Sequence, residues 1–384
     1  MMSDTEDLIR WRRHLHAHPE TAFEEVETAK MVADLLTSFG IEVTTGIGGT
    51  GVVGVLKRGD GPNVGLRADM DALPIREKNE FSHASTHDGK MHACGHDGHT
   101  TMLLGAAREL AAMDDWAGTI TFIFQPAEEN EGGAIAMIED GLFERFPVDA
   151  VFGLHNWPGL PAGQFTVRAG PMMAAYDIFE IRLTGRGAHA AMPHLGTDTL
   201  VAAAQLVTEL QTLVSRRVNP LHPAVVSVTQ IHGGDAYNVL PAESIIRGCV
   251  RTFHDEARSV IRDVMAEMAE AVATTAGLTA SVDYDQRYVA TVNSEAETAL
   301  AKRAAGDALG PDAIVEGVDP SMGSEDFGAM LEAKPGAYVW LGNDHPAGEN
   351  FGLHHDRYDF NDEILEPGVR YWVSLARRFL EERG

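Results

Sequence analysis

TITFIFQPAEE, residues 119–129, says more about the architecture of this 384-residue chain than any other stretch of comparable length. Its first six residues are all β-branched or aromatic, a pattern typical of a strand buried on both faces. Two acidic residues, Glu128 and Glu129, follow where that strand is expected to end. In open α/β sheets, ligands bind just outside the carboxyl ends of the strands, so this stretch predicts both a sheet and a site.

Helix-like and strand-like segments alternate on both sides of this strand. EVETAKMVADLLTSF, residues 25–39, has apolar side chains at helical spacing, and a second helix is predicted over 100–113. Further strands are predicted over 148–154 and in GAYVWLGN, 336–343, and a last helix begins near residue 361. This alternation predicts an α/β domain with a mostly parallel sheet flanked by helices.

Two glycine-rich stretches near the N-terminus predict turns. GVVGVL, 51–56, and NVGLRAD, 63–69, flank a Gly-Asp-Gly-Pro turn and predict a hairpin. GIGGTGVVG, 46–54, contains G-x-G-x-x-G, but a dinucleotide site needs a helix directly after the glycines. Because VVGVL is strand-like, we interpret this stretch as a turn between strands.

The pattern changes near residue 174, where a second type of domain begins. YDIFEIRLT, 176–184, alternates polar and apolar residues, as a strand with one buried face does. The predicted elements then run strand, helix, strand, strand, helix, strand, over residues 176–184, 197–217, 224–231, 243–253, 255–276 and 278–288. This order is the ferredoxin-like β-α-β-β-α-β unit. We therefore predict a lid or dimerisation domain, 174–288, inserted into a catalytic domain made of 1–173 and 289–384.

Charge and composition limit the classes of partner. The formal net charge of −27 argues against nucleic acids and anionic membranes, whose binding requires basic surfaces. No apolar run approaches the roughly 18 residues of a membrane-spanning helix. Two cysteines and the absence of an apolar leader-like stretch indicate a reducing compartment, so we expect a cytoplasmic protein.

Side chains that bind metals recur near the ends of predicted strands and in loops before helices. They are Asp69, Asp71, Cys94, His96, Asp97, His99, Glu128, Glu129, His155, His354 and His355. One such residue would be an ordinary surface side chain, but five separate segments are expected to bring them to one edge of one sheet. The sequence therefore favours a metal site over a set of solvated loops.

The residue types narrow the chemistry. Cysteine, histidine and glutamate together suit Zn²⁺ or a similar divalent ion better than Mg²⁺ or Ca²⁺. In an extended loop Cys94 and His96, two residues apart, would project to the same side. The adjacent Glu128 and Glu129 would diverge, leaving one as a ligand and the other as a general base. A serine or cysteine hydrolase is a weaker alternative, because the sequence has no G-x-S-x-G motif and a metal-bound Cys94 is no nucleophile.

A longer set of motifs resembles a known family. It comprises RADMDALP (67–74), MHACGHDGHT (91–100), QPAEE (125–129), GLHNWP (153–158), GRGAHAAMPH (185–194), NVLPAES (238–244), GSEDF (323–327) and LHHDRYDF (353–360). In this order they resemble the aminoacylase/carboxypeptidase family of dinuclear metallohydrolases, and within it the amidohydrolase branch of hippurate and indole-acetyl-amino-acid hydrolases. The resemblance spans nearly the whole chain. The fold it implies, a zinc-exopeptidase-like catalytic domain with an inserted ferredoxin-like lid, is similar to the one predicted above.

The resemblance also implies the roles of individual residues. The implied ligands of two divalent ions, zinc or manganese, are Cys94, His96, Glu129, His155 and His354. Glu128 matches the catalytic carboxylate, and Asp71 matches the aspartate that orients the metal centre. His354 is chosen over His355 because of its distance from the Tyr358–Phe360 motif.

Three residues of the inserted domain match positions that act on substrate in the family. His189 matches the lid histidine, whose implied role is to donate a hydrogen bond to the developing oxyanion. His194 and Asn238 are implied substrate contacts, with Asn238 often acting across a dimer interface. Closure of the lid would use hinges near Ala174 and Val289.

The expected function is hydrolysis of the amide bond of N-acyl amino acids, with Glu128 as general base, in a homodimer formed through the lid. Three alternatives stay open: a dipeptidase, a deacetylase of the N-acetyl-diaminopimelate type, and a non-catalytic metal-binding member of the fold. A second, unligated carboxylate argues against the last of these. Met172, Met173 and Trp157 either line the acyl pocket or belong to the core.

Overall fold

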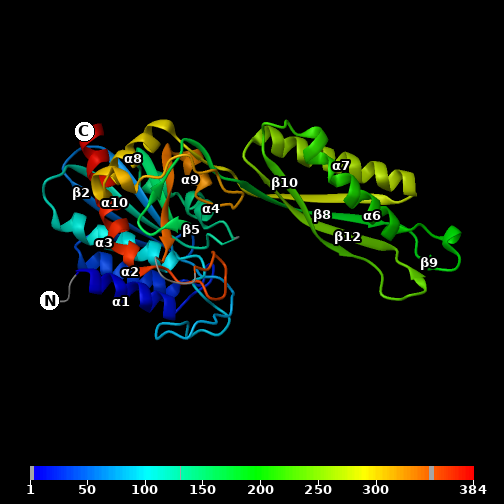
Figure 1. The fold of residues 1–384 in the computed structure, drawn as a ribbon, viewed down its shortest axis with the longest axis horizontal. Helices are drawn as coiled ribbons and strands as arrows, with labels where there is room; N and C mark the ends of the chain where they lie inside the picture. Colours follow the sequence, from blue (N-terminus) through cyan, green and yellow to red (C-terminus); the bar gives the residue numbers. More distant parts are fainter. Residues whose placement is uncertain (1–3, 130, 346–349) are drawn as a thin grey trace. The chain divides into compact units, whose positions relative to one another are not determined.

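The computed structural model describes residues 4–129, 131–345 and 350–384, and the chain forms two compact units (Figure 1). The large unit consists of Met1–Met172, Thr291–Asp319 and Asp326–Gly384. The small unit consists of Met173–Ala290 and Pro320–Glu325. Each unit has its own cluster of buried hydrophobic side chains.

The large unit is built on a seven-stranded sheet with the order β1-β2-β4-β3-β5-β15-β6. The strands are β1 (Glu42–Ile47), β2 (Gly51–Arg58), β3 (Asn63–Asp69), β4 (Gly118–Gln125), β5 (Ala150–Pro161), β6 (Phe165–Thr166) and β15 (Gly336–Asp344). The four central strands, β4, β3, β5 and β15, are mutually parallel, and antiparallel strands lie at both edges. The predicted α/β fold is thus confirmed, with the parallel strands at its centre.

Helices surround this sheet. They are α1 (Asp4–Ala17), α2 (Val26–Ser38), α3 (His96–Ala112), α4 (Gly133–Glu139), α5 (Leu142–Arg145), α8 (Glu295–Leu309), α9 (Gly328–Ala333) and α10 (Leu365–Arg383). The long helices α1, α2, α3, α8 and α10 pack into one core with one face of the sheet, whereas α4 and α9 contact each other. In β4, Phe122 and Phe124 enter that core and the intervening Ile123 belongs to the opposite face, which is also buried.

The predicted hairpin between residues 51–56 and 63–69 is wrong. β2 and β3 do not pair, because β4 lies between them and pairs antiparallel with β2 and parallel with β3. β4, which is buried on both faces, lies between β2 and β3. The turn that joins β2 to β3 passes the start of β4, where Thr119 N donates to Pro62 O. The hairpin partner of β2 is instead β1, so the interpretation of residues 46–54 as a turn between strands is confirmed.

The small unit contains β8 (Ala175–Thr184), α6 (Thr199–Leu210), β10 (Ala224–His232), β12 (Glu243–Thr252), α7 (Asp255–Ala276) and β13 (Thr279–Tyr288). Its antiparallel sheet has the order β10-β12-β8-β13, the ferredoxin-like arrangement that the sequence predicted. Alternate residues Phe179, Ile181 and Leu183 of β8 are buried against α6 and α7. The helix predicted over 197–217 is shorter, since α6 ends at Leu210 and one π-helical turn follows it.

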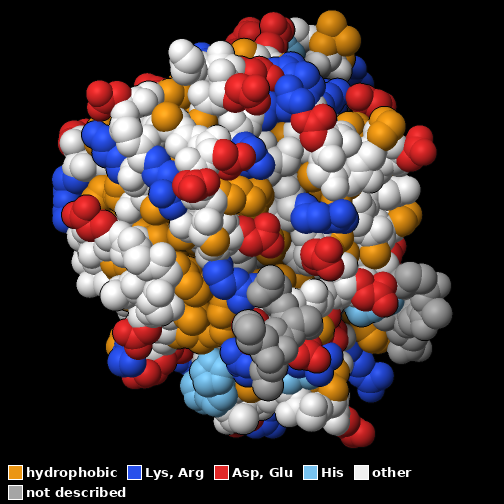
Figure 2. All heavy atoms as spheres, turned by 90° about the vertical axis from the view of Figure 1, so that its left-hand side faces the viewer, with side chains coloured by type: hydrophobic (Ala, Val, Ile, Leu, Met, Phe, Trp, Pro, Cys, Tyr) orange, Lys and Arg blue, Asp and Glu red, His pale blue; other side chains and the backbone are white. Residues whose placement is uncertain are grey.

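The surface is densely charged. On the face shown in Figure 2, acidic and basic side chains are interspersed rather than gathered by sign. Ion pairs join exposed side chains of opposite charge, for example Arg377 with Asp115 at 2.6 Å. No helix in the described ranges has the length and apolar character needed to cross a bilayer.

Candidate metal centre

The metal-binding side chains predicted from the sequence meet at the carboxyl ends of the central strands. Asp69 ends β3, and the two glutamates follow β4 after Pro126 and Ala127. Two segments differ from expectation. His155 lies inside β5 rather than after a strand, and His96, Asp97 and His99 lie in the first turn of α3 rather than in a loop. The helix begins earlier because Gly95 supplies the turn that starts it.

Gly95 also corrects the geometry expected for Cys94 and His96. The stretch is not extended, since Gly95 has a left-handed φ of 91°. A Cβ at this position would lie 2.2 Å from Asn156 Oδ1 and 2.7 Å from the Tyr358 hydroxyl. Only glycine fits there, and the turn it makes places Cys94 before the helix and His96 at its first position.

The predicted ligands form three overlapping groups. In each group the side-chain ligand atoms lie within 4.8 Å of one another, and the groups are Cys94-His96-His155, Cys94-Glu129-His354 and His96-Glu128-Glu129. Cys94 Sγ lies 3.4 Å from His155 Nε2, and His354 Nε2 lies 3.2 Å from Glu129 Oε1. The structure therefore brings together Glu128 and the five side chains named as ligands.

The orientation of the histidines fits a divalent metal. His96 is fully buried; its Nδ1 lies 3.1 Å from Asp71 Oδ1, and its Nε2 has no hydrogen-bond partner among the described residues. His155 Nδ1 lies 2.6 Å from the Asn156 carbonyl oxygen, which leaves Nε2 facing Cys94. Metal-binding histidines are typically held in this way, with one nitrogen on an oxygen acceptor and the other on the ion. A buried nitrogen without a partner is otherwise costly.

Electrostatics also favour a cation at this position. Burial, helped by the neighbouring His99, holds the pKa of His155 well below its ordinary value, so the ring is neutral and able to bind a metal. Burial and the nearby carboxylates of Glu129 and Glu128 raise the pKa of the Cys94 thiol. Burial opposes charge on His96, yet Asp69 and Asp71 outweigh it and raise its pKa to about 10. A metal ion would compete with that proton and would stabilise the thiolate.

Asp71 contacts both sides of the cluster. One carboxylate oxygen faces His96, and the other accepts a hydrogen bond of 2.9 Å from the backbone N–H of Glu129. The side chain itself is buried. Asp71 is thus placed to orient two of the predicted ligands at once.

The two acidic residues after β4 each have a carboxylate oxygen within 4.8 Å of the other and of a His96 ring nitrogen, but their further contacts differ. The Glu129 carboxylate points to His354, and Glu128 is 7% exposed, with Oε1 3.4 Å from the backbone N–H of Asp326. Ala127, directly before them, has a positive φ of 52°. The placement of both carboxylates therefore depends on an unusual backbone conformation as well as on sequence adjacency.

Backbone strain gathers near this cluster. Within the described ranges, three residues other than glycine have a positive φ: Phe23 at 60°, Ala127 at 52° and His354 at 64°. Such conformations cost of order 1–3 kcal/mol each and persist where the surroundings impose them, often at functional sites. His354 is itself a predicted ligand, and Ala127 precedes the paired glutamates.

The choice between the two adjacent histidines agrees with their contacts. His354 approaches Glu129, whereas His355 stacks on Phe351 with ring centroids 4.5 Å apart. His355 also lies 3.5 Å from Asp356. Only the first of the two histidines faces the cluster.

Three other residues flagged by the sequence lie behind the cluster. Both oxygens of Asp69 are engaged, one by His99 Nδ1 at 2.6 Å and the other by Arg67 at 2.8 Å. Asp97 is directed to His16 Nδ1 at 2.9 Å and to Arg12 at 3.7 Å. These side chains support the cluster from the core side.

Asn156 and Tyr358 had no predicted role, but they connect three segments around the cluster. The backbone N–H of Asn156 donates to His99 Nε2 at 3.0 Å, and its side chain lies 2.6 Å from the Tyr358 hydroxyl. The position of Asn156 next to His155 in GLHNWP was the only signal available for it. Together these contacts tie β5, α3 and the segment before α10 to one another.

The predicted substrate residues of the inserted domain lie together in the small unit. His189 in β9 (Ala188–His189) pairs with β11 (Val239–Leu240), and Ala190 N donates to Asn238 O at 2.9 Å. His194 lies in the short helix η1 (Pro193–Leu195), which contacts β9. All three side chains are exposed.

Met172, Met173 and Trp157 were predicted either to line the acyl pocket or to belong to the core, and their environments differ. Met172 and Met173 are buried, so they belong to the core. Trp157 is half-buried and stacks on Trp340, with ring centroids 3.8 Å apart and planes 6° from parallel. Trp157 therefore presents a fixed aromatic edge next to His155, whose ring centroid is 6.1 Å away.

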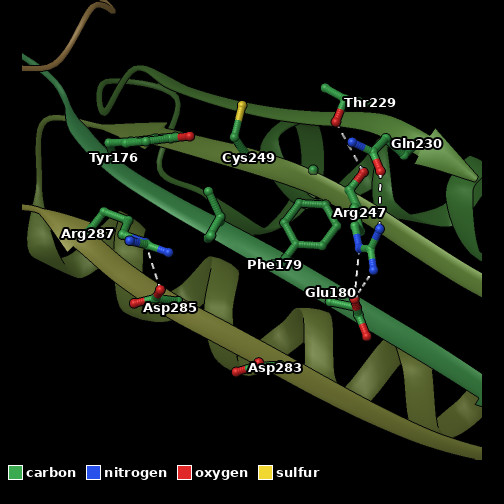
Figure 3. A pocket seen from close by; sticks show the side chains of 12 residues that line it. Tyr176, Phe179, Glu180, Thr229, Gln230, Arg247, Cys249, Asp283, Asp285 and Arg287 are labelled. Carbon is green, nitrogen blue, oxygen red and sulfur yellow. Dashed lines mark hydrogen bonds and ion pairs between the residues drawn. The ribbon is translucent and has the colours of Figure 1, made fainter. Parts of the chain in front are cut away.

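A separate hollow of about 490 Å³ lies on the open face of the small unit's sheet (Figure 3). It is lined by a cross-strand ladder in which Arg247 contacts Glu180 at 2.7 Å and Gln230 at 3.4 Å. Cys249 lies on the same face and forms no disulfide. Apolar side chains such as Ile178 and Phe179 line it together with the charged ones, and it contains no group of metal ligands among the residues described.

Comparison with known proteins agrees with this arrangement. Residues 65–378 match peptidase family M20/M25/M40. The chain is 40% identical to the hippurate hydrolase of Campylobacter jejuni over 371 residues, which cover 96% of each protein. It is 46% identical to the N-acyl-L-amino acid amidohydrolase of Geobacillus stearothermophilus over 290 residues, covering 75% of this chain and 78% of the relative. A Bacillus subtilis crystal structure described as a dinuclear metal binding peptidase superposes with a TM-score of 0.85 at 36% identity, with 99% of each chain covered.

Proposed function

The chain belongs to peptidase family M20/M25/M40, and on that basis we propose that it hydrolyses the amide bond of N-acyl amino acids at a centre of two divalent metal ions. The observation that carries the proposal is the buried cluster of His96, His155 and Cys94 with an additional carboxylate, Glu128, beside it. The names of the relatives, a hippurate hydrolase and an N-acyl-L-amino acid amidohydrolase, support the substrate class. The cluster supports a catalytic over a purely structural centre, because a structural ion needs no spare carboxylate.

We assign the metal ions to Cys94, His96, Glu129, His155 and His354. Bound divalent ions would polarise the scissile carbonyl and make water a better nucleophile at neutral pH. The mixed sulfur, nitrogen and oxygen donors suit zinc, and manganese is the alternative. Asp71 would hold His96 and the Glu129 segment in position.

Glu128 is the proposed general base. It would take a proton from the attacking water and deliver it to the leaving amine. Its near-complete burial and its place between Ala127 and Glu129 support this role. Trp157 would form one wall for the acyl group.

We propose that residues 174–288 act as a lid that supplies further contacts to substrate. His189 would donate to the oxyanion, and His194 and Asn238 would contact the substrate. Their proximity within the small unit supports a shared task. Motion about residues near Ala174 and Val289 would bring them to the reacting groups.

The small unit is also the proposed site of homodimerisation. Exposed apolar side chains gather there, including Val201 at 64% and Ile231 at 50% exposure. β10, which contains Ile231, is an edge strand of its sheet, and exposed edges pair readily with other strands. A second copy would cover α6 and β10. Sedimentation of Val201→Asp and Ile231→Asp proteins tests this, and unchanged assembly in both contradicts it.

A cytoplasmic location is proposed from the two cysteines, both free in this fold. Fractionation of the native cells, with the protein detected by antibody, tests it.

A substrate panel tests the proposed reaction. Chelated protein is reloaded with Zn²⁺ or Mn²⁺ and supplied with N-acetyl, N-benzoyl and N-indoleacetyl amino acids, together with dipeptides and N-acetyl-diaminopimelate. We expect metal-dependent release of the amino acid from the N-acyl compounds. Preferential cleavage of the dipeptides or of N-acetyl-diaminopimelate would assign the chain to an alternative class. If the metal-loaded protein turns over no member of the panel, a non-catalytic metal-binding role is the alternative that remains.

A further inference from the structure

The loop that carries Glu128 and Glu129 requires an external restraint. Ala127 has a φ of 52°, in the left-handed region that residues with a Cβ seldom occupy. The residue is completely buried, so water does not hold its backbone. Its carbonyl oxygen accepts from Gly133 N at 2.9 Å, which fixes only one side of the peptide.

The restraint on the other side is Glu25, from a distant part of the sequence. Glu25 Oε1 accepts a hydrogen bond of 2.9 Å from Ala127 N, and Oε2 accepts one of 2.5 Å from Thr50 Oγ1. The side chain is 0% exposed. One buried carboxylate thus joins the start of α2, the β1–β2 turn and the loop after β4.

Glu25 is available for this contact because another residue caps the helix. It occupies the N-cap position of α2, but its side chain makes no capping hydrogen bond. Glu20 accepts instead from Glu27 N at 3.1 Å and Thr28 N at 2.9 Å. The chain therefore uses one glutamate for the helix and directs the other into the core.

The segment from Ala127 to Glu129 is held at both ends by carboxylates. The N–H of Ala127 donates to Glu25, and the N–H of Glu129 donates to Asp71. Glu128 lies between the two anchored amides. Its side chain direction is consequently set by two acceptors that come from outside the loop.

We propose that Glu25 is a positioning residue, which holds Ala127 in the left-handed conformation and thereby aims Glu128 at the reacting water and Glu129 at the metal. The effect on catalysis rests on the proposed function, since it assumes the roles given to those two glutamates. The contact itself does not, and it can be measured separately.

The Glu25 contact requires a hydrogen-bonding atom facing Ala127 and another facing Thr50, and it does not require a charge. Burial, reinforced by the charge of Asp71, raises the pKa of Glu25 to about 7, while the Thr50 and Ala127 donors oppose this. A glutamine at this position would accept from Ala127 N with its oxygen and donate to the Thr50 hydroxyl with its nitrogen. Glu25→Gln is therefore the conservative variant, and Glu25→Ala removes the contact.

Hydrogen exchange measures the contact without reference to activity. In metal-loaded, full-length protein, we expect the amides of Gln125 and residues 127–129 to exchange at least 10-fold faster in Glu25→Ala than in the wild type. Exchange in Glu25→Gln should match the wild type, and a peptide from β13 should be unchanged in both. Glu24→Ala is the matched control, since Glu24 is exposed and pairs with Lys90 at the surface. Unchanged exchange in Glu25→Ala overturns the proposal whatever the enzyme hydrolyses.

Kinetics then measure the consequence. With one N-acyl substrate of the wild type, we expect Glu25→Ala to lower kcat by about 10- to 100-fold with KM within a few fold, because small displacements of catalytic groups have effects of this size. Because Asp71 still anchors the N–H of Glu129, metal content by elemental analysis should stay within error, and Glu25→Gln should restore kcat. If the wild type turns over no N-acyl compound, the proposed function fails, and the exchange result still decides the role of Glu25.

A second variant separates backbone positioning from general loosening of the fold. Glycine adopts positive φ freely, so Ala127→Gly in the Glu25→Ala background should recover part of the lost kcat. Loss of kcat that neither Glu25→Gln nor Ala127→Gly relieves overturns the positioning role. If Glu25→Ala does not fold, Thr50→Val removes one of the two hydrogen bonds to Glu25. This variant should raise the amide exchange of Gln125 and residues 127–129 and lower kcat about 3-fold. The absence of both changes would overturn the proposal.

Discussion

The two units present their chemistry-bearing side chains in opposite ways. In the large unit, His96 and Asp71 are buried and each is fixed by partners from another segment. In the small unit, His189 and Asn238 are exposed on strands only two residues long or beside them. Groups that must hold an ion need a preformed shell, whereas groups that meet a substrate only after closure need freedom to move. The site that we propose is divided in the same way, into a rigid part in the large unit that would hold the ions and an adaptable part in the small unit that would meet the substrate.

The largest expected effect lies in the rigid part. Glu128→Gln should lower kcat by roughly 10²- to 10⁴-fold, because the general base is lost while every proposed ligand remains. Elemental analysis should find the metal content unchanged. If Glu128→Gln loses metal and Glu129→Gln keeps both metal and a normal ligand sphere, the two roles are reversed.

The adaptable part should give a smaller effect of a different kind. His189→Ala is expected to lower kcat by about 10²-fold, the size expected for one donor to an oxyanion, with metal content and melting temperature preserved. Steady-state kinetics with elemental analysis decide this, and His232→Ala, an exposed histidine of β10, is the control. Near-normal kcat in His189→Ala would leave the small unit as a dimerisation module only.

Cys94→Ser tests whether the Cys94 thiolate is a ligand of the metal ion. A hydroxyl is a poor ligand for a borderline-soft cation, so we expect metal affinity to fall by about 10-fold or more, with activity falling in parallel. Competition with a fluorescent chelator measures the affinity. Cys249→Ser, in the small unit, should change neither quantity. Full occupancy in an inactive Cys94→Ser protein would exclude the ligand role.

The smallest effect concerns stability and pH. The pKa of Glu25 is raised to about 7 in the folded state, mainly by burial, so the folded protein favours the protonated acid. The stability that the protonated Glu25 side chain contributes to the folded state is present below the ordinary glutamate pKa near 4.5 and is lost as pH rises through 7. Glu25→Gln should therefore melt a few degrees above the wild type at pH 8 and approach it at pH 5.

Calorimetry across that pH range measures the difference. Glu267→Gln, an exposed residue of α7, should show no pH-dependent difference from the wild type. A constant offset for Glu25→Gln at all pH values would show that the charge of Glu25 is not the cause.

Local patterns were sufficient where one segment determines its own structure. The alternation in 176–184 located a half-buried strand, and the apolar stripe of 25–39 located α2 almost to the residue. Residue types at strand ends identified the candidate ligands, because parallel strands converge at one edge. These features depend on periodicity and composition alone.

Long-range pairing was beyond those patterns. The partner of β2 is β4, about 60 residues further along the chain, so adjacency predicted the wrong hairpin. Glu25 and Ala127 are 102 residues apart, and nothing near either of them marks the contact. Asn156 acts through His99 in another element. Contacts of this kind exist only after the chain has folded, which is why Glu25 and Asn156 had no predicted role, whereas the candidate ligands could be named from their residue types and from the family resemblance.

The position of β15 has a consequence for biosynthesis. This strand lies between β5 and β6, although it is the last of the sheet to be synthesised. The ribosome therefore releases β5 with an uncovered edge and delivers the whole of residues 173–290 before the strand that covers it. We expect the small unit, continuous apart from one short segment, to fold first during translation, while the nascent large unit depends on chaperones to protect that edge. Because the proposed ligand His354 follows β15, the proposed metal centre would be complete only after that strand has been synthesised.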